Sequence, residues 1–294
     1  MKAFDARRVG IALAPAVLVA VPLAVLGVAR GAWWLTLAAT AALALTVAVV
    51  LRRPMRRLRA LREPFPARWR ELLDEHVSFY RCLDEEHRRR FEDDVRIVLT
   101  DLHFEGVRGA PVAEQSKVLA GAGAAMLVHG HPEWELPATR SIVVYPEAFD
   151  DEYRIGADGE SDIAGMVQHA GAIVFSERDL TGDWANHRRG HNVALHEFAH
   201  VLDLEDGYAD GVPGALAPRA LEPWLERMKI EMDNVRGGRS ALRPYAATNE
   251  AELFAVAVEL FFERPKRMQE QHPELYAALR DYFALDPATL CAEE

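Results

Sequence analysis

The chain has 294 residues, of which 50% are apolar and 27% are charged, a composition that excludes a disordered or collagen-like protein. Its two cysteines, Cys82 and Cys291, are too few for a disulfide-rich scaffold or a Cys-rich zinc module. The net charge of −11 is unevenly distributed, because residues 1–62 hold ten basic residues and one acidic residue. Residues 63–294 therefore carry a net charge of −20. We expect no direct binding to nucleic acid, because phosphate contacts need a basic surface.

Residues 1–62 are predicted to form a membrane anchor. Residues 9–29 and 32–51 are uncharged runs separated only by Arg30 and Gly31, and each would span roughly 30 Å as a helix. Basic residues flank the outer ends of both runs, and two tryptophans lie at the link, a distribution that places both ends in the cytoplasm. We expect a transmembrane hairpin in the inner (cytoplasmic) membrane. The alternative, a cleaved signal peptide, has a shorter apolar core and no second span.

Residues 63–294 are predicted to form one α+β domain that is mostly helical and contains a small sheet. Prolines at 64 and 66 break the chain after the anchor, and apolar residues recur at helical spacing over 67–105. A run of small residues at 113–128 predicts a helix that packs closely against a neighbour. Short β-branched runs at 141–145 and 171–175 predict strands, and helical periodicity returns from residue 192.

The sequence His196-Glu197-Phe-Ala-His200 is an H-E-x-x-H motif. Residues four apart share one face of a helix, so both imidazoles can reach one metal ion. Glu197 lies beside that face, where it can act as general base on a water that zinc activates. The flanking residues are almost all apolar, so the helix is predicted to be buried, and buried polar side chains need partners.

Catalytic zinc needs a third protein ligand and an open position. No third histidine follows at the short spacing typical of metzincins, because position 206 is an aspartate. Residues 251–262 are apolar except for Glu252 and Glu259, and a carboxylate in a buried helix needs a partner. Metal coordination would supply one for Glu252. For Glu259 a solvated position is an equal alternative, and Glu250 is expected to be solvated.

These residues lie in segments that resemble the Mlc titration factor A family of zinc-dependent peptidases. Residues 191–203, 249–265 and 279–287 carry most of the resemblance, which covers about 64–290. The zinc-site segment is also similar to the catalytic domain of anthrax lethal factor, in which a tyrosine lies seven residues before the glutamate ligand. Tyr245 has the same spacing from Glu252.

The resemblance implies a zincin-like metallopeptidase domain that holds one Zn²⁺ per chain. It implies His196, His200 and Glu252 as metal ligands, Glu197 as general base, and Tyr245 as a hydroxyl donor to the oxyanion. Two features depart from the family: the two-span anchor, where its best-known members are soluble, and the segment 129–140, which lacks a stretch rich in tryptophan and tyrosine.

Other polar residues near the motif have less defined roles. Asp203 could accept a proton from a ligand imidazole or cap a neighbouring element. Asn192 is expected to be the N-cap of the motif helix, and His187 and His191 precede it without a predicted metal role. Two further histidines, His129 and His131, are expected to be solvated.

The sequence therefore predicts a membrane-anchored zinc metallopeptidase of gluzincin type that hydrolyses a peptide or protein substrate in the cytoplasm. The rival is a regulatory binding protein that sequesters a transcriptional regulator, with weak or incidental hydrolysis, a role that the resemblance also implies. A purely structural zinc site would need four protein ligands, and the sequence offers three good ones.

Overall fold

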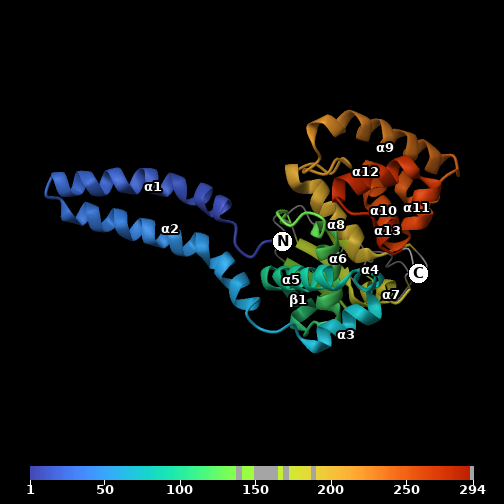
Figure 1. Cartoon of the computed structure of the whole chain (residues 1–294), viewed down its shortest axis with the longest axis horizontal. Coiled ribbons are helices and arrows are strands. Elements are labelled where there is room, and N and C mark those ends of the chain that lie inside the picture. The colour runs from blue at the N-terminus through green and yellow to red at the C-terminus, as the bar shows by residue number, and fades with distance from the viewer. Residues whose placement is uncertain (137–140, 149–164, 168–171, 187–189, 292–294) are drawn as a thin grey trace. The chain divides into compact units, whose positions relative to one another are not determined.

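The computed structural model describes residues 1–136, 141–148, 165–167, 172–186 and 190–291, which are mostly helical with a small mixed sheet (Figure 1). Internal contacts divide the chain into a unit at Lys2–Pro64 and a second at Phe65–Glu294, to which Met1 also belongs. The boundary predicted between residues 62 and 63 stays a prediction.

The N-terminal unit is a helical hairpin. Asp5 caps helix α1 (Ala6–Ala29), and Gly31, with a φ of +66°, makes the turn into helix α2 (Trp33–Ala60). The two helices lie side by side (Figure 1). Both are long and apolar enough to cross a membrane. Helix α2 continues nine residues beyond the predicted apolar run, through Pro54 and the arginines that follow it.

The second unit begins with helices α3 (Ala67–His76), α4 (Ser78–Cys82) and α5 (Glu85–Asp101), and helix α6 (Glu114–Val128) is buried along most of its length. A side chain at Gly121 would collide with Leu99, and one at Gly123 would collide with Ala194 at 2.8 Å. The small residues of α6 therefore permit the close helix packing that the sequence predicted.

The four strands of the sheet lie in the order β1-β2-β4-β3, with β3 antiparallel and the other three parallel. The strands are β1 (His103–Gly106), β2 (Ser141–Tyr145), β3 (Gly165–Val167) and β4 (Ala172–Ser176). The predictions at 141–145 and 171–175 are confirmed to within one residue. The expectation of helices up to residue 105 is wrong for β1, which pairs with β2 in register from His103 opposite Ser141.

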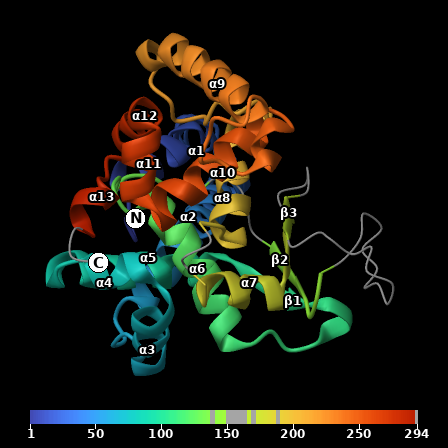
Figure 2. The same cartoon turned by 90° about the vertical axis from the view of Figure 1, so that its right-hand side faces the viewer.

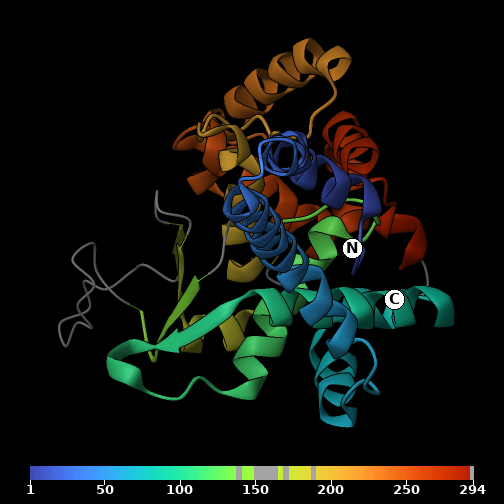
Figure 3. The same ribbon diagram turned by 90° about the vertical axis from the view of Figure 1, so that its left-hand side faces the viewer.

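The remaining helices complete the core around α6 and α8. Figure 2 shows the sheet on one side of these two helices and α9–α13 on the other, and Figure 3 gives the opposite view. The elements are α7 (Glu177–Trp184), α8 (Val193–Asp203), α9 (Leu221–Arg236), α10 (Glu250–Glu263), α11 (Pro265–Gln271), α12 (Pro273–Phe283) and α13 (Pro287–Leu290), with 3₁₀ turns η1 (Val107–Gly109), η3 (Leu204–Asp206), η4 (Pro218–Ala220) and η5 (Pro244–Ala247).

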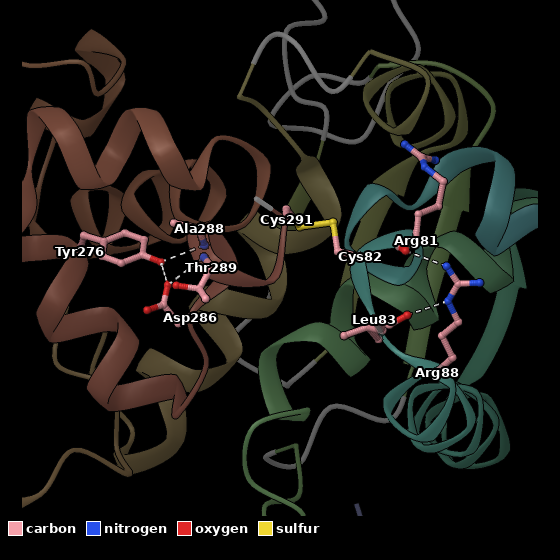
Figure 4. Close-up of a disulfide and its surroundings, with 9 residues drawn as sticks. All are labelled: Arg81, Cys82, Leu83, Arg88, Tyr276, Asp286, Ala288, Thr289 and Cys291. Carbon is pink, nitrogen blue, oxygen red and sulfur yellow. Dashed lines mark hydrogen bonds between the residues drawn. A yellow bond between two sulfur atoms is a disulfide. The ribbon is translucent and has the colours of Figure 1, made fainter. Parts of the chain in front are cut away.

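A disulfide joins Cys82 at the end of α4 to Cys291 just after α13, with 5.1 Å between the Cα atoms (Figure 4). Its two cysteines are 209 positions apart, so the bond links the two ends of the second unit. The Tyr276 hydroxyl donates to Asp286 and accepts from the Ala288 N–H, which fastens α13 to α12. This pairing could not be predicted from the sequence, because spacing does not reveal which distant thiols meet.

We expect Cys82→Ser and Cys291→Ser each to lower the Tm of the purified, oxidised protein by roughly 5–15 °C, because the cross-link restricts the unfolded chain. Differential scanning calorimetry checks this. The double variant should be no less stable than either single variant, since all three lack the same bond. A wild-type Tm that does not change on treatment with a dithiol reductant would contradict the prediction.

Candidate metal centre

Helix α8 presents two imidazoles on one face. Its N-cap Asn192 accepts hydrogen bonds from the backbone N–H groups of Ala194 and Leu195, as predicted. Apolar side chains bury most of the helix against α6 and α10. One turn apart, His196 and His200 bring their Nε2 atoms to within 3.2 Å of each other.

Glu252 reaches these imidazoles from the first turn of α10. The side chain of Asn249 caps this helix by accepting from the Glu252 N–H at 2.9 Å. Glu252 Oε2 lies 3.1 Å from His196 Nε2 and 3.6 Å from His200 Nε2. The structure thus brings together the three side chains that the sequence proposed as metal ligands.

The three side chains have the spacing that a metal ion requires. Ligand atoms about 2.0–2.2 Å from a tetrahedral zinc lie roughly 3.3–3.6 Å apart. The observed separations are 3.1, 3.2 and 3.6 Å. In the neutral imidazole, donation from His196 Nδ1 to Glu259 leaves the lone pair on Nε2, the nitrogen that faces the cluster. Two imidazoles and one carboxylate suit a divalent metal and leave a coordination position open.

Glu259 lies two turns after Glu252 in α10. It contacts His196 but is not one of the three side chains of the cluster. Its side chain is 0% exposed, which excludes the solvated position. Its carboxylate accepts from His196 Nδ1 and from the Asn192 N–H, each at 2.7 Å, and pairs with the guanidinium of Arg243. A carboxylate behind a ligand imidazole fixes its tautomer and orientation. Arg243 was not found from the sequence, where it carried no signal.

Electrostatics favour a cation among the three side chains. Burial would lower the pKa of His196, but hydrogen bonds to Glu252 and Glu259 outweigh it and raise the pKa to about 10. Burial would raise the pKa of Glu252, but the two imidazoles hold it well below its usual range. The raised pKa of His196 shows that the two carboxylates stabilise a positive charge at this point, which a bound metal ion would supply.

Glu197 and the cluster line one cleft of about 470 Å³. Glu197 is 4% exposed and lies outside the group of three, although it neighbours His196 in the chain. Burial raises the pKa of its carboxyl group. A carboxylate made more basic in this way is suited to accept a proton from water. The cleft is further lined by strand β3, Leu204, Ala209 and Tyr245.

Tyr245 lies at the rim of the cleft on η5 and is 50% exposed. Its ring centroid is 6.1 Å from that of His196, and the guanidinium carbon of Arg243 is 5.8 Å from the centroid of the Tyr245 ring. Burial of the phenol and the nearby Glu252 raise the pKa of Tyr245 to about 12. The side chain therefore remains a neutral hydroxyl, able to donate a hydrogen bond.

The other polar residues that the structure describes near the motif lie outside the cluster of His196, His200 and Glu252. Asp203 is buried, and burial raises the pKa of its carboxyl group to about 6. His191 is half-buried beside Asp183, and Glu250 is exposed. The position of His187 lies outside the described residues.

The expectation that His129 is solvated is wrong. It is 0% exposed at the end of α6, where Nδ1 lies 3.0 Å from Asp94 and the rings of Phe79 and Phe91 pack against it. His131 is half-buried and stacks on Trp134. Neither histidine lines the cleft that contains His196 and His200.

Comparison with known proteins agrees with this geometry. The model of the glucose-regulated metallo-peptidase M90 family matches residues 51–284. The chain belongs to this family. A Synechocystis protein described as uncharacterized is 29% identical over 240 residues, which cover 78% of this chain and 87% of that protein. The M90 assignment confirms the predicted family.

Two further relatives are named Mlc titration factor A. The protein from Yersinia enterocolitica is 27% identical over 238 residues, covering 75% of this chain and 86% of its own length. That from Yersinia pestis is 26% identical over 238 residues, with coverage of 75% and 85%. The M90 match begins at residue 51, so most of the apolar hairpin precedes it.

We expect His196→Ala, His200→Ala and Glu252→Ala each to abolish stoichiometric metal binding, measured by elemental mass spectrometry of the purified protein. Glu259→Gln should retain the metal with about 10–100-fold lower affinity in chelator competition, because it weakens the support behind His196 and leaves all three ligand side chains in place. Glu250→Ala changes an exposed glutamate two residues before Glu252 in α10. It is the matched control and should bind the metal normally. Full metal content in Glu252→Ala together with loss in Glu259→Ala would reverse these assignments.

Proposed function

We propose that this protein is a zinc-dependent peptidase of gluzincin type, in which His196, His200 and Glu252 hold one Zn²⁺. The proposal is supported chiefly by the convergence of two imidazoles and one carboxylate in an open cleft, within a chain of the M90 family. When bound, the metal would lower the pKa of a water molecule and polarise the peptide carbonyl.

The surrounding residues have complementary roles in this proposal. Glu197 accepts the proton of the attacking water, since its carboxylate lies beside the ligands and its pKa is raised by burial. Tyr245 donates its hydroxyl proton in a hydrogen bond to the developing oxyanion. Glu259 keeps His196 in one orientation throughout, because it accepts from Nδ1, which faces away from the cluster.

Glu197→Gln keeps the shape of the side chain and removes the proton acceptor. We expect the metal to stay and peptide hydrolysis to fall by about 10²–10⁴-fold. Tyr245→Phe should also keep the metal and lose about 10²–10³-fold in kcat, with little change in KM, because its hydrogen bond forms mainly in the transition state. Steady-state kinetics on a fluorogenic peptide library, with metal analysis of each variant, checks both.

Each variant can contradict the proposal by a different outcome. Normal hydrolysis by Glu197→Gln would mean that the measured activity belongs to another site or a contaminant. Full activity of Tyr245→Phe would leave the metal chemistry intact and require a different oxyanion donor. Tyr208→Phe, which changes an exposed tyrosine outside the cleft, is the matched control and should match the wild type.

A second candidate function is regulatory binding. It is favoured by the name of the Yersinia relatives, Mlc titration factor A, which describes titration of another factor. In this alternative the chain sequesters a transcriptional regulator, and hydrolysis is incidental. The test uses a strain that lacks the gene for this protein. If a Glu197→Gln variant without peptidase activity still restores normal transcriptional regulation in that strain, binding would be favoured over catalysis.

We propose that the hairpin anchors the domain in the inner (cytoplasmic) membrane, with the domain facing the cytoplasm. Helices α1 and α2 have suitable length and composition, and arginines flank both outer ends while only Arg30 lies at the link. This distribution follows the positive-inside rule. Cytoplasmic disulfides are rare, so under this orientation Cys82 and Cys291 are expected to be thiols in growing cells and to join on oxidation.

A reporter fused after Glu294 tests the orientation. We expect cytoplasmic reporter activity, protection of the domain from protease added to intact cells, and alkylation of both cysteines when cells are lysed in a thiol-trapping reagent. A periplasmic or extracellular reporter signal with the disulfide already formed in cells would contradict the proposed orientation, and it would leave the peptidase proposal untouched.

A further inference from the structure

Strand β3 packs against the face of α8 that carries the proposed catalytic side chains. At one position of the strand, no side chain separates the strand from the helix. A Cβ atom placed on Gly165 would lie 2.6 Å from Glu197 Oε1, 2.8 Å from Glu197 Cγ and 2.7 Å from Val193 Cγ2. Real Cβ atoms essentially never approach other heavy atoms this closely. The backbone of β3 thus touches the side chain that we propose as general base.

A lack of space for a side chain, rather than the backbone conformation, explains why residue 165 is a glycine. Gly165 pairs with Phe175 in the antiparallel register of β3 and β4, an extended conformation that other residues also adopt. Gly182 in α7 provides the contrast, because a Cβ there would meet nothing within 4 Å. An added methyl group at position 165 therefore tests only the close approach of β3 to α8.

Neither strand β3 nor Val193 can easily retreat from a methyl group added at position 165. Gly165 is opposite Phe175 of β4 in the antiparallel register, and the Phe175 side chain is fully buried against Phe198 of α8. Val193 is buried in the first turn of α8. The strand and the helix are therefore held on both sides, and the Glu197 side chain is the part that would have to move.

We propose that Gly165 is a positioning residue, whose bare backbone forms the wall that keeps the Glu197 carboxylate beside the His196, His200 and Glu252 cluster. This inference rests on the proposed peptidase function for its kinetic consequence. Its geometric consequence is independent of that function, because the carboxylate must shift if the wall gains a methyl group.

The test compares Gly165→Ala with the matched control Gly182→Ala in the full chain. We expect Gly165→Ala to keep one metal ion and to lose about 10–100-fold in kcat with KM nearly unchanged, since misplacing a reacting group by about 1 Å has effects of this size. Crystal structures of both variants should show the Glu197 carboxylate displaced in Gly165→Ala only. Should Gly165→Ala not fold, Val193→Ala/Gly165→Ala removes one of the two collisions and takes the same measurements.

Shortening the base provides a rescue that a general structural defect would not. Glu197→Asp withdraws the carboxylate by one methylene, so Gly165→Ala should cost much less in this background than in the wild type. Equal losses in both backgrounds, or an unmoved carboxylate in Gly165→Ala, would overturn the inference. A wild type without hydrolysis would instead contradict the peptidase proposal, and the displacement of Glu197 would still decide the role of Gly165.

Discussion

The arrangement of the site depends on the buried carboxylate of Glu259. Removing one partner of a buried charged pair typically costs about 3–5 kcal/mol, so this side chain constrains every group that satisfies it. It holds His196 through Nδ1, the first turn of α8 through the Asn192 N–H, and Arg243 through an ion pair. These contacts fix the register of α8 against α10. Glu252, seven residues earlier on α10, consequently meets both imidazoles.

The parts of the site that depend on local sequence could be predicted. Spacing along one helix dictates that His196 and His200 share a face, whatever surrounds them. The carboxylate of Glu252 stands out because its helix is otherwise apolar, so burial alone demands a partner. The same reasoning applied to Glu259 but left its role open, since periodicity gives the face of a helix and not the atom that it meets.

The parts that depend on distant segments could not be predicted. His129 has the sequence context of a loop, yet it is buried because Asp94 lies 35 positions away in the chain and 3.0 Å away in space. Strand β3 is three residues long and has no periodicity to detect. Its contact with Glu197 arises only when the sheet packs on α8, so Gly165 carried no signal. The disulfide pairing is another such long-range contact.

We propose that two imidazoles and one carboxylate hold a single zinc ion and leave one coordination position for water. X-ray absorption spectroscopy at the zinc edge of the purified full-length protein tests this most directly. We expect four light-atom ligands at about 2.0–2.1 Å, two of them imidazoles, with one imidazole contribution lost in His200→Ala. A sulfur ligand, four ligands all supplied by the protein, or a spectrum unchanged by His200→Ala would contradict it.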